Sequence, residues 1–124
     1  MRSDLCERTF DFSVRIYKLC KELDKKSVNE TVICRQLLKS GTSVCANVEE
    51  GQAGQSRSDF LSKYNIALKE ARETLYWLRL LAAVEVFSQD KLSGLLNECD
   101  ELVAILTTIV KKVRHERSEI RSQK

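Results

Sequence analysis

Apolar residues recur at alternating steps of three and four through the last third of this chain, and this pattern most restricts how it can fold. The members of this stripe are Leu92, Leu95, Leu96, Cys99, Leu102, Val103, Leu106, Ile109, Val110 and Val113. Such spacing places apolar side chains along one side of an α-helix, and a stripe of several turns must pack against other helices. The pattern therefore predicts a long helix within a helical bundle.

The rest of the chain fits further helices joined by short connections. It has no proline and only four glycines in 124 residues, too few turn signals for an all-β fold. Helical patterns are expected at about residues 5–25, 29–50, 57–86 and from 89 onward. Short connections make consecutive helices antiparallel neighbours. We predict an all-α, up-down-up-down antiparallel four-helix bundle over residues 1–115, followed by a basic C-terminal tail at residues 116–124.

Hydroxyl residues and a glycine are expected to mark helix ends. Ser27 with Glu30 three residues later has the spacing of a capping box, and Ser56 or Ser58 is expected to cap the third helix. Gly51 is expected to end the second helix, because glycine is common just after a helix C-terminus.

A line of polar residues runs beside the apolar stripe of the second predicted helix. Its steps of four, three, four and three keep these side chains on one face. The members are Gln36, Ser40, Ser43, Asn47 and Glu50. Polar groups along an apolar seam need hydrogen-bond partners, so we expect bonds to a neighbouring helix or to another subunit. A ligand site is the alternative.

The first predicted helix carries two apolar stripes on nearly opposite sides, one of them Phe10, Val14 and Tyr17. One stripe can face the core, and the other would form an exposed apolar patch. We expect a homo-oligomer in which the surplus stripe meets another subunit, although long neighbouring side chains could instead cover it. The predicted interface residues are Phe12, Ile16, Leu19 and Leu23 of this helix, with Trp77 of the third.

Excess positive charge gathers at the C-terminus. Residues 111–124 hold six Lys/Arg and two Glu, a net of +4, whereas the whole chain carries +3. Such a cluster can neutralise phosphates, and no aromatic residue interleaves it, so contacts to a nucleic-acid backbone are expected there. A solvated terminus is the alternative; the tail is too polar for a membrane-surface helix. The predicted nucleic-acid-binding residues are Lys111, Lys112, Arg114, Arg117 and Arg121.

Residue types typical of catalytic and metal centres are missing or misplaced. The only histidine is His115, in the basic tail, which leaves no inward histidine for a di-metal site or for nucleophilic catalysis. Five cysteines without a C-x-x-C pair disfavour disulfides and zinc. Two acidic pairs occupy helix faces that do not converge: Glu70 and Glu73, and Glu98 and Glu101. We therefore expect no catalytic residue, no metal, no cofactor and no enzymatic activity.

The chain shows no apolar run near the roughly 20 residues that span a bilayer. Its first residues carry mixed charge and do not form a signal peptide. We expect a cytoplasmic protein that does not enter a membrane.

Residues 36–51 read Gln-Leu-Leu-Lys-Ser-Gly-Thr-Ser-Val-Cys-Ala-Asn-Val-Glu-Glu-Gly. This segment resembles the Q-L-x-R-S-x-x-S-V-x-x-N-I-A-E-G signature of the bacterial four-helix-bundle family of 23S rRNA-intervening-sequence proteins. Residues 58–60 and 66–78 look like the third-helix pattern of the same family, at the same distance from the signature. Departures are Lys39 for the usual arginine, Glu49 for alanine, and Gln55 where a basic residue is common.

The resemblance implies a left-handed four-helix bundle that assembles as a ring, a pentamer, without enzymatic activity. Some members of the family are encoded inside ribosomal RNA genes. Related bundles are accessory proteins to reverse transcriptases in retroelements and bind nucleic acid and the polymerase. We expect a non-enzymatic homo-oligomer that binds structured RNA or DNA through backbone contacts. The alternative is a protein-interaction scaffold that holds a partner such as a reverse transcriptase.

Overall fold

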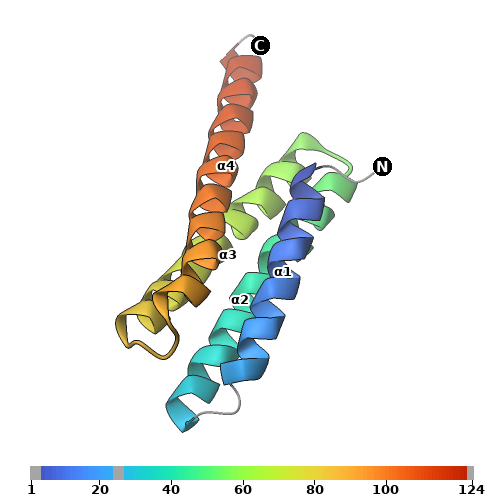
Figure 1. The fold of residues 1–124 in the computed structure, drawn as a ribbon. Helices are drawn as coiled ribbons and strands as arrows, with labels where there is room; N and C mark the ends of the chain where they lie inside the picture. Colours follow the sequence, from blue (N-terminus) through green and yellow to red (C-terminus); the bar gives the residue numbers. More distant parts are fainter. Residues whose placement is uncertain (1–3, 24–26, 123–124) are drawn as a thin grey trace.

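The computed structural model describes residues 4–23 and 27–122, and four helices account for nearly all of them (Figure 1). The helices are α1 (Asp4–Leu23), α2 (Val28–Ala53), α3 (Arg57–Ala83) and α4 (Gln89–Ser122). Each helix packs along the next one in the chain, while α1 and α4 meet over a much smaller contact. The predicted all-α four-helix bundle is confirmed. The end expected for the first helix, near residue 25, lies outside the described residues.

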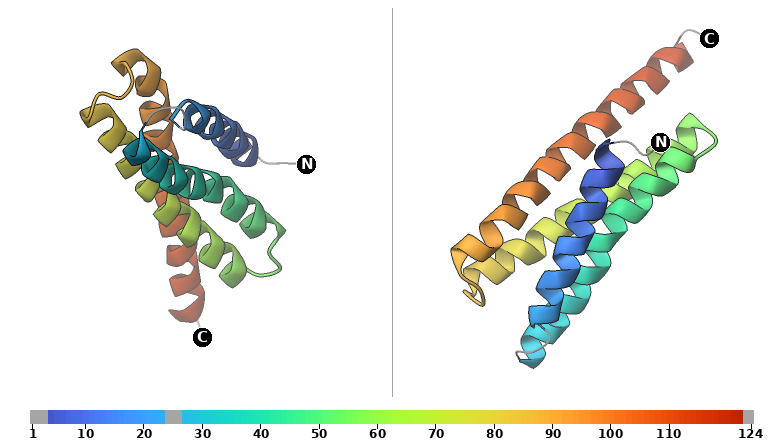
Figure 2. Two further views of the ribbon diagram at one scale, coloured as in Figure 1. Left: turned by 90° about the horizontal axis from the view of Figure 1, so that it is seen from below. Right: turned by 45° about the vertical axis from the view of Figure 1, so that its right-hand side comes forward.

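Helix α4 is the longest element, with 34 residues against 20 in α1. It continues without a break through residue 115, so the described part of the predicted tail is the last turns of α4. These turns project past the ends of the neighbouring helices (Figure 2). Within the described ranges, none of the helices has an apolar stretch of membrane-spanning length.

The core face of α1 is the stripe that we expected to form a subunit interface. Phe12, Ile16, Leu19 and Leu23 are at most 3% exposed and pack within one core cluster with residues of the other three helices. Trp77 is partly buried against the same cluster. The interface prediction for the four α1 residues is therefore wrong. Their stripe runs to the last residue of α1, so it can bury more apolar surface than the shorter stripe of Phe10, Val14 and Tyr17.

The other apolar stripe on α1 faces outward. Phe10 is 48% exposed, Val14 37% and Tyr17 53%. Helix α1 thus carries two apolar stripes as predicted, but the one expected at a subunit interface is buried in the core. The other, made of these three residues, is called the exposed apolar stripe of α1.

The helix N-termini agree only in part with the expected caps. The Ser56 side chain accepts a hydrogen bond of 3.0 Å from the backbone N–H of Asp59, which confirms it as the cap of α3. Ser27 precedes α2 as predicted, but its side chain makes no cap hydrogen bond. The expected capping box with Glu30 is therefore not formed.

The second helix does not end at Gly51. Helix α2 continues to Ala53, and Gly54 follows as its cap, donating its backbone N–H to the Gly51 carbonyl at 3.2 Å. Gly51 is instead a buried position inside the helix, held against the ring of Tyr64. Its lack of a side chain serves packing rather than chain reversal.

All five cysteine side chains are buried, where a free cysteine packs as a small apolar residue. Burial, with smaller contributions from Asp100 and Glu98, raises the pKa of the Cys99 thiol from 9.0 to about 12. Cys99 donates its S–H to the Ala71 carbonyl at 3.4 Å.

We expect iodoacetamide to modify Cys99 in urea but not in the native protein, because only the thiolate reacts. The folded pKa exceeds the unfolded one, so the thiol's contribution to stability is complete below the unfolded value and is lost as pH rises toward about 12. Peptide mass spectrometry of the labelled chain measures how much Cys99 is modified in the native and in the unfolded protein. Equal labelling of Cys99 in native and unfolded protein would contradict it.

Candidate nucleic-acid interface

A groove between α3 and α4 collects four cationic side chains around one cavity of about 270 Å³. The cavity is lined by Asn65, Leu68, Lys69, Arg72, Thr107, Val110, Lys111 and Arg114. The two helices lie side by side along this groove (Figure 1). We call it the cationic groove.

Helix geometry explains why these cations meet. Lys69 and Arg72 are three residues apart on α3, and Lys111 and Arg114 are three apart on α4, so each pair shares one helix face. The antiparallel packing brings the two pairs to the same level. The Arg114 guanidinium donates a 3.1 Å hydrogen bond from Nη2 to Oδ1 of Asn65, which links the two walls. The groove is therefore built from rigid helices, not from a loop.

The floor of the cationic groove is apolar and its rim is charged. Leu68 and Val110 are 7% and 2% exposed and belong to the second core cluster. The four cations are exposed above them, and none of the lining residues, all within the described chain, is acidic. Like charges gathered in one hollow give a positive potential that attracts anions.

The two glutamates of the last turns of α4 are engaged elsewhere. Glu116 Oε2 accepts from Arg57 Nη1 at 3.1 Å, and Glu119 Oε1 lies 3.1 Å from His115 Nε2. Neither carboxylate lines the cationic groove. The positive charge of the groove is therefore not offset by either of these glutamates.

The five predicted nucleic-acid-binding residues do not all lie together. Lys111 and Arg114 line the cationic groove, and Arg117 and Arg121 follow them at steps of three and four along α4. Lys112 lines a different, mainly apolar cavity of about 410 Å³ where α1 begins.

Lys69 and Arg72 were not predicted from the sequence. Each lies next to a glutamate in the chain, so the local net charge is small. Their spacing of three indicates a shared helix face. Only the packing register of α3 against α4 shows that this face lies opposite Lys111 and Arg114.

The polar line of α2 does not form one continuous site. Ser40 is fully buried, and its Oγ lies 2.9 Å from Oγ1 of Thr74, a hydrogen bond that joins α2 to α3. Asn47 donates from Nδ2 to the Ser43 carbonyl at 2.8 Å, within α2 itself. The two outermost members are exposed: Gln36 and Glu50. The structure thus gives an interhelical bond at Ser40 and places the other members at or near the surface.

The acidic pairs are not brought together either. Glu98 accepts from Arg8 Nε at 2.8 Å and Nη2 at 2.7 Å, and Glu101 accepts from the same Nη2 at 3.0 Å. These bonds fasten α1 to α4, and the hydrogen bond to Glu98 is the main cause that raises the pKa of Arg8. On α3, burial and then Glu73 raise the pKa of Glu70. Across residues 4–23 and 27–122, no group of acidic, histidine and cysteine side chains is placed to hold a metal.

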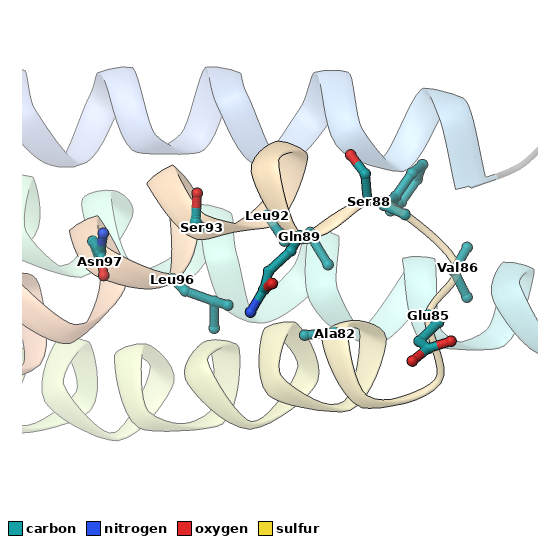
Figure 3. A pocket seen from close by; sticks show the side chains of 10 residues that line it. Ala82, Glu85, Val86, Ser88, Gln89, Leu92, Ser93, Leu96 and Asn97 are labelled. Atoms are coloured by element: carbon teal, nitrogen blue, oxygen red, sulfur yellow. The ribbon is translucent and has the colours of Figure 1, made fainter.

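A second cavity between α3 and α4, of about 600 Å³, lies at the connection of the two helices. Figure 3 shows the Gln89 and Leu96 side chains of α4 pointing toward Ala82 of α3 across it. Its lining includes Glu85, which has a positive φ of 58°, and no cation. A carboxylate without cations does not suit a phosphate, so the cationic groove is the better anion site.

The family that matches this chain is described as 23S rRNA-intervening sequence protein, and the match covers residues 1–108. The chain belongs to this family. The match confirms the resemblance seen in residues 36–51. Lys69 and Arg72 lie inside the matched region, whereas Lys111 and Arg114 lie beyond it.

A similar solved structure comes from Bacteroides thetaiotaomicron VPI-5482 and is described as a protein of unknown function from the S23 ribosomal protein family. It is 40% identical, aligns over 86% of this chain and 98% of its own, and superimposes with a TM-score of 0.78. Among curated proteins, no relative matches this chain. The solved relative therefore shares the fold of this chain.

Proposed function

We propose that this family member is a non-enzymatic cytoplasmic protein that binds structured RNA or DNA through its phosphate backbone, in the cationic groove. The observation that carries the proposal is the convergence of four cations from two helices on one hollow without an acidic lining residue. Lys and Arg that neutralise phosphates release counterions, and this drives binding without reading the sequence. The name of the family supports RNA as the first probe.

Repetition of the groove would strengthen such weak contacts. The exposed apolar stripe of α1 supports a homo-oligomer, because a patch of this kind on a soluble surface is usually covered by a partner. A ring of copies, with five as the number implied by the resemblance, would present several grooves to one polymer and raise its avidity.

The direct test is fluorescence anisotropy of a labelled structured RNA at rising salt. Binding that weakens steeply with salt is the expected result, with a slope of roughly one per phosphate contact. No binding at low salt would overturn the proposal.

Reversing the charges on the α3 wall should remove most of this affinity. We expect Lys69→Glu with Arg72→Glu to weaken binding at least about tenfold and to flatten the salt slope, because two phosphate contacts are replaced by repulsion. The matched control is Lys21→Glu with Arg35→Glu, which makes the same change in net charge at exposed positions on α1 and α2. Equal losses in both double variants would show a diffuse effect of net charge instead of a groove.

A second candidate function is a scaffold that holds a partner polypeptide, such as a reverse transcriptase. The exposed apolar stripe of α1 favours it, because Phe10, Val14 and Tyr17, which are 48%, 37% and 53% exposed, give one helix face an apolar surface that a partner could cover. Partner binding would survive charge reversal in the groove and fail in Val14→Lys. These two variants separate the two functions.

A further inference from the structure

Helix α3 continues the cationic groove with an aromatic side chain. Lys69, Arg72, Tyr76 and Arg79 follow one another at steps of three, four and three, so they lie in one line on the helix surface. Tyr76 stands one turn beyond Arg72, with a further cation one turn beyond it. The basic turns of α4 lack any aromatic residue, but the facing helix supplies one.

The Tyr76 ring is held in place while most of its surface stays open. It is 53% exposed and contacts the Trp77 ring in a T-shaped arrangement, with centroids 4.9 Å apart and planes at 73°. Trp77 is itself partly buried, and its Nε1 donates to Oε2 of Glu73 at 3.4 Å. An aromatic ring that is fixed by its neighbour loses little freedom when a second flat group stacks on it.

We infer that the cationic groove and Tyr76 together bind an unpaired stretch of nucleic acid, with phosphates on the cations and one base stacked on the tyrosine ring. This inference rests on the proposed function and narrows its ligand from any phosphate backbone to a single-stranded polynucleotide. Proteins that bind single strands combine a positive groove with aromatic stacking surfaces, because every base has a π face and an unpaired base can leave its neighbours. A base inside a duplex cannot reach Tyr76, so a duplex gains only the phosphate contacts.

The test compares a short oligouridine with an RNA duplex of equal length, using the full chain. We expect Tyr76→Ala to weaken oligouridine binding about fivefold or more, in line with the usual contribution of one stacked base. Duplex binding should change little, and Tyr76→Phe should bind oligouridine like the original chain because the ring is kept. Ile66→Ala, another truncation of a half-exposed side chain on α3, is the control.

Photocrosslinking gives a readout that a merely structural role of Tyr76 would not produce. An iodouridine-substituted oligomer should form its adduct at Tyr76, as mapped by mass spectrometry. Similar binding of oligothymidine supports the inference, because phosphates and base faces are common to both polymers. Oligouridine affinity that is unchanged in Tyr76→Ala, an equal loss for the duplex, or an adduct elsewhere would overturn it.

The two proposals fail in different ways. If neither oligouridine nor duplex binds at low salt, the proposed function is wrong and this inference falls with it. If both probes bind and depend on Lys69 and Arg72 but not on Tyr76, nucleic-acid binding stands and the stacking inference alone is overturned.

Discussion

Replacing Ile16 by lysine is expected to unfold the bundle. Ile16 is fully buried, and the Cβ position of Gly41 lies only 2.9 Å from its Cγ2, so α2 packs tightly against it. An unpaired ammonium group in such a site costs several kcal/mol, against a total stability of about 5–15 kcal/mol for a domain. Circular dichroism should show loss of helix or a large fall in the urea midpoint. A folded Ile16→Lys variant of ordinary stability would contradict the buried position.

Replacing Val14 by lysine, two residues away on the opposite side of α1, should leave the bundle folded. Val14 is 37% exposed, and lysine is a better helix former than valine. If the exposed apolar stripe of α1 joins subunits, the charge should split the assembly into smaller particles by light scattering. Val32→Lys on α2, at a site 55% exposed, is the matched control. An unchanged mass of Val14→Lys would exclude the stripe as an interface, and an original chain that is monomeric at micromolar concentration would exclude the homo-oligomer.

This contrast shows what the sequence could and could not predict about the fold. The apolar repeat that includes Leu92 and Leu106 determines one burial face for α4, and the prediction there is confirmed because both residues are fully buried. Helix α1 has two apolar faces, and periodicity alone does not rank them. The ranking depends on how much of each face its neighbours cover, which is a property of the assembled bundle.

The candidate site likewise contains residues that the sequence predicts and residues that it does not. Lys111 and Arg114 were predicted because their segment is rich in charge of one sign. Lys69 and Arg72 alternate with Glu70 and Glu73 in the chain, and only the tertiary register brings them to the same hollow. Local composition is enough to predict a cluster of charges that is contiguous in sequence. To predict a groove between two helices, one must also know which residues far apart in the chain lie close together in the fold.

Substitution of Gly51 is the second change expected to lower stability strongly, because Gly51 packs inside the bundle and does not end helix α2. A Cβ at this position would lie 2.6 and 2.7 Å from Cδ1 and Cε1 of Tyr64. The ring cannot easily move: Tyr64 is 1% exposed, stacks on Phe60 with centroids 4.0 Å apart, and accepts a 2.7 Å hydrogen bond from Nε2 of Gln52. Overpacking of this kind costs about 1–3 kcal/mol.

We therefore expect Gly51→Ala to lower the free energy of unfolding by about 1–3 kcal/mol, even though alanine is the better helix former. Gly94→Ala in α4 is the matched variant. Gly94 is exposed, and the nearest atom to its Cβ position is Nη2 of Arg15 at 3.0 Å, the far end of a flexible side chain. There alanine should stabilise the protein by roughly 0.5–1 kcal/mol. Urea unfolding of the two variants measures both effects. A Gly51→Ala variant that is as stable as the original chain, or more stable, would mean that the Tyr64 ring yields and that packing does not require glycine at position 51.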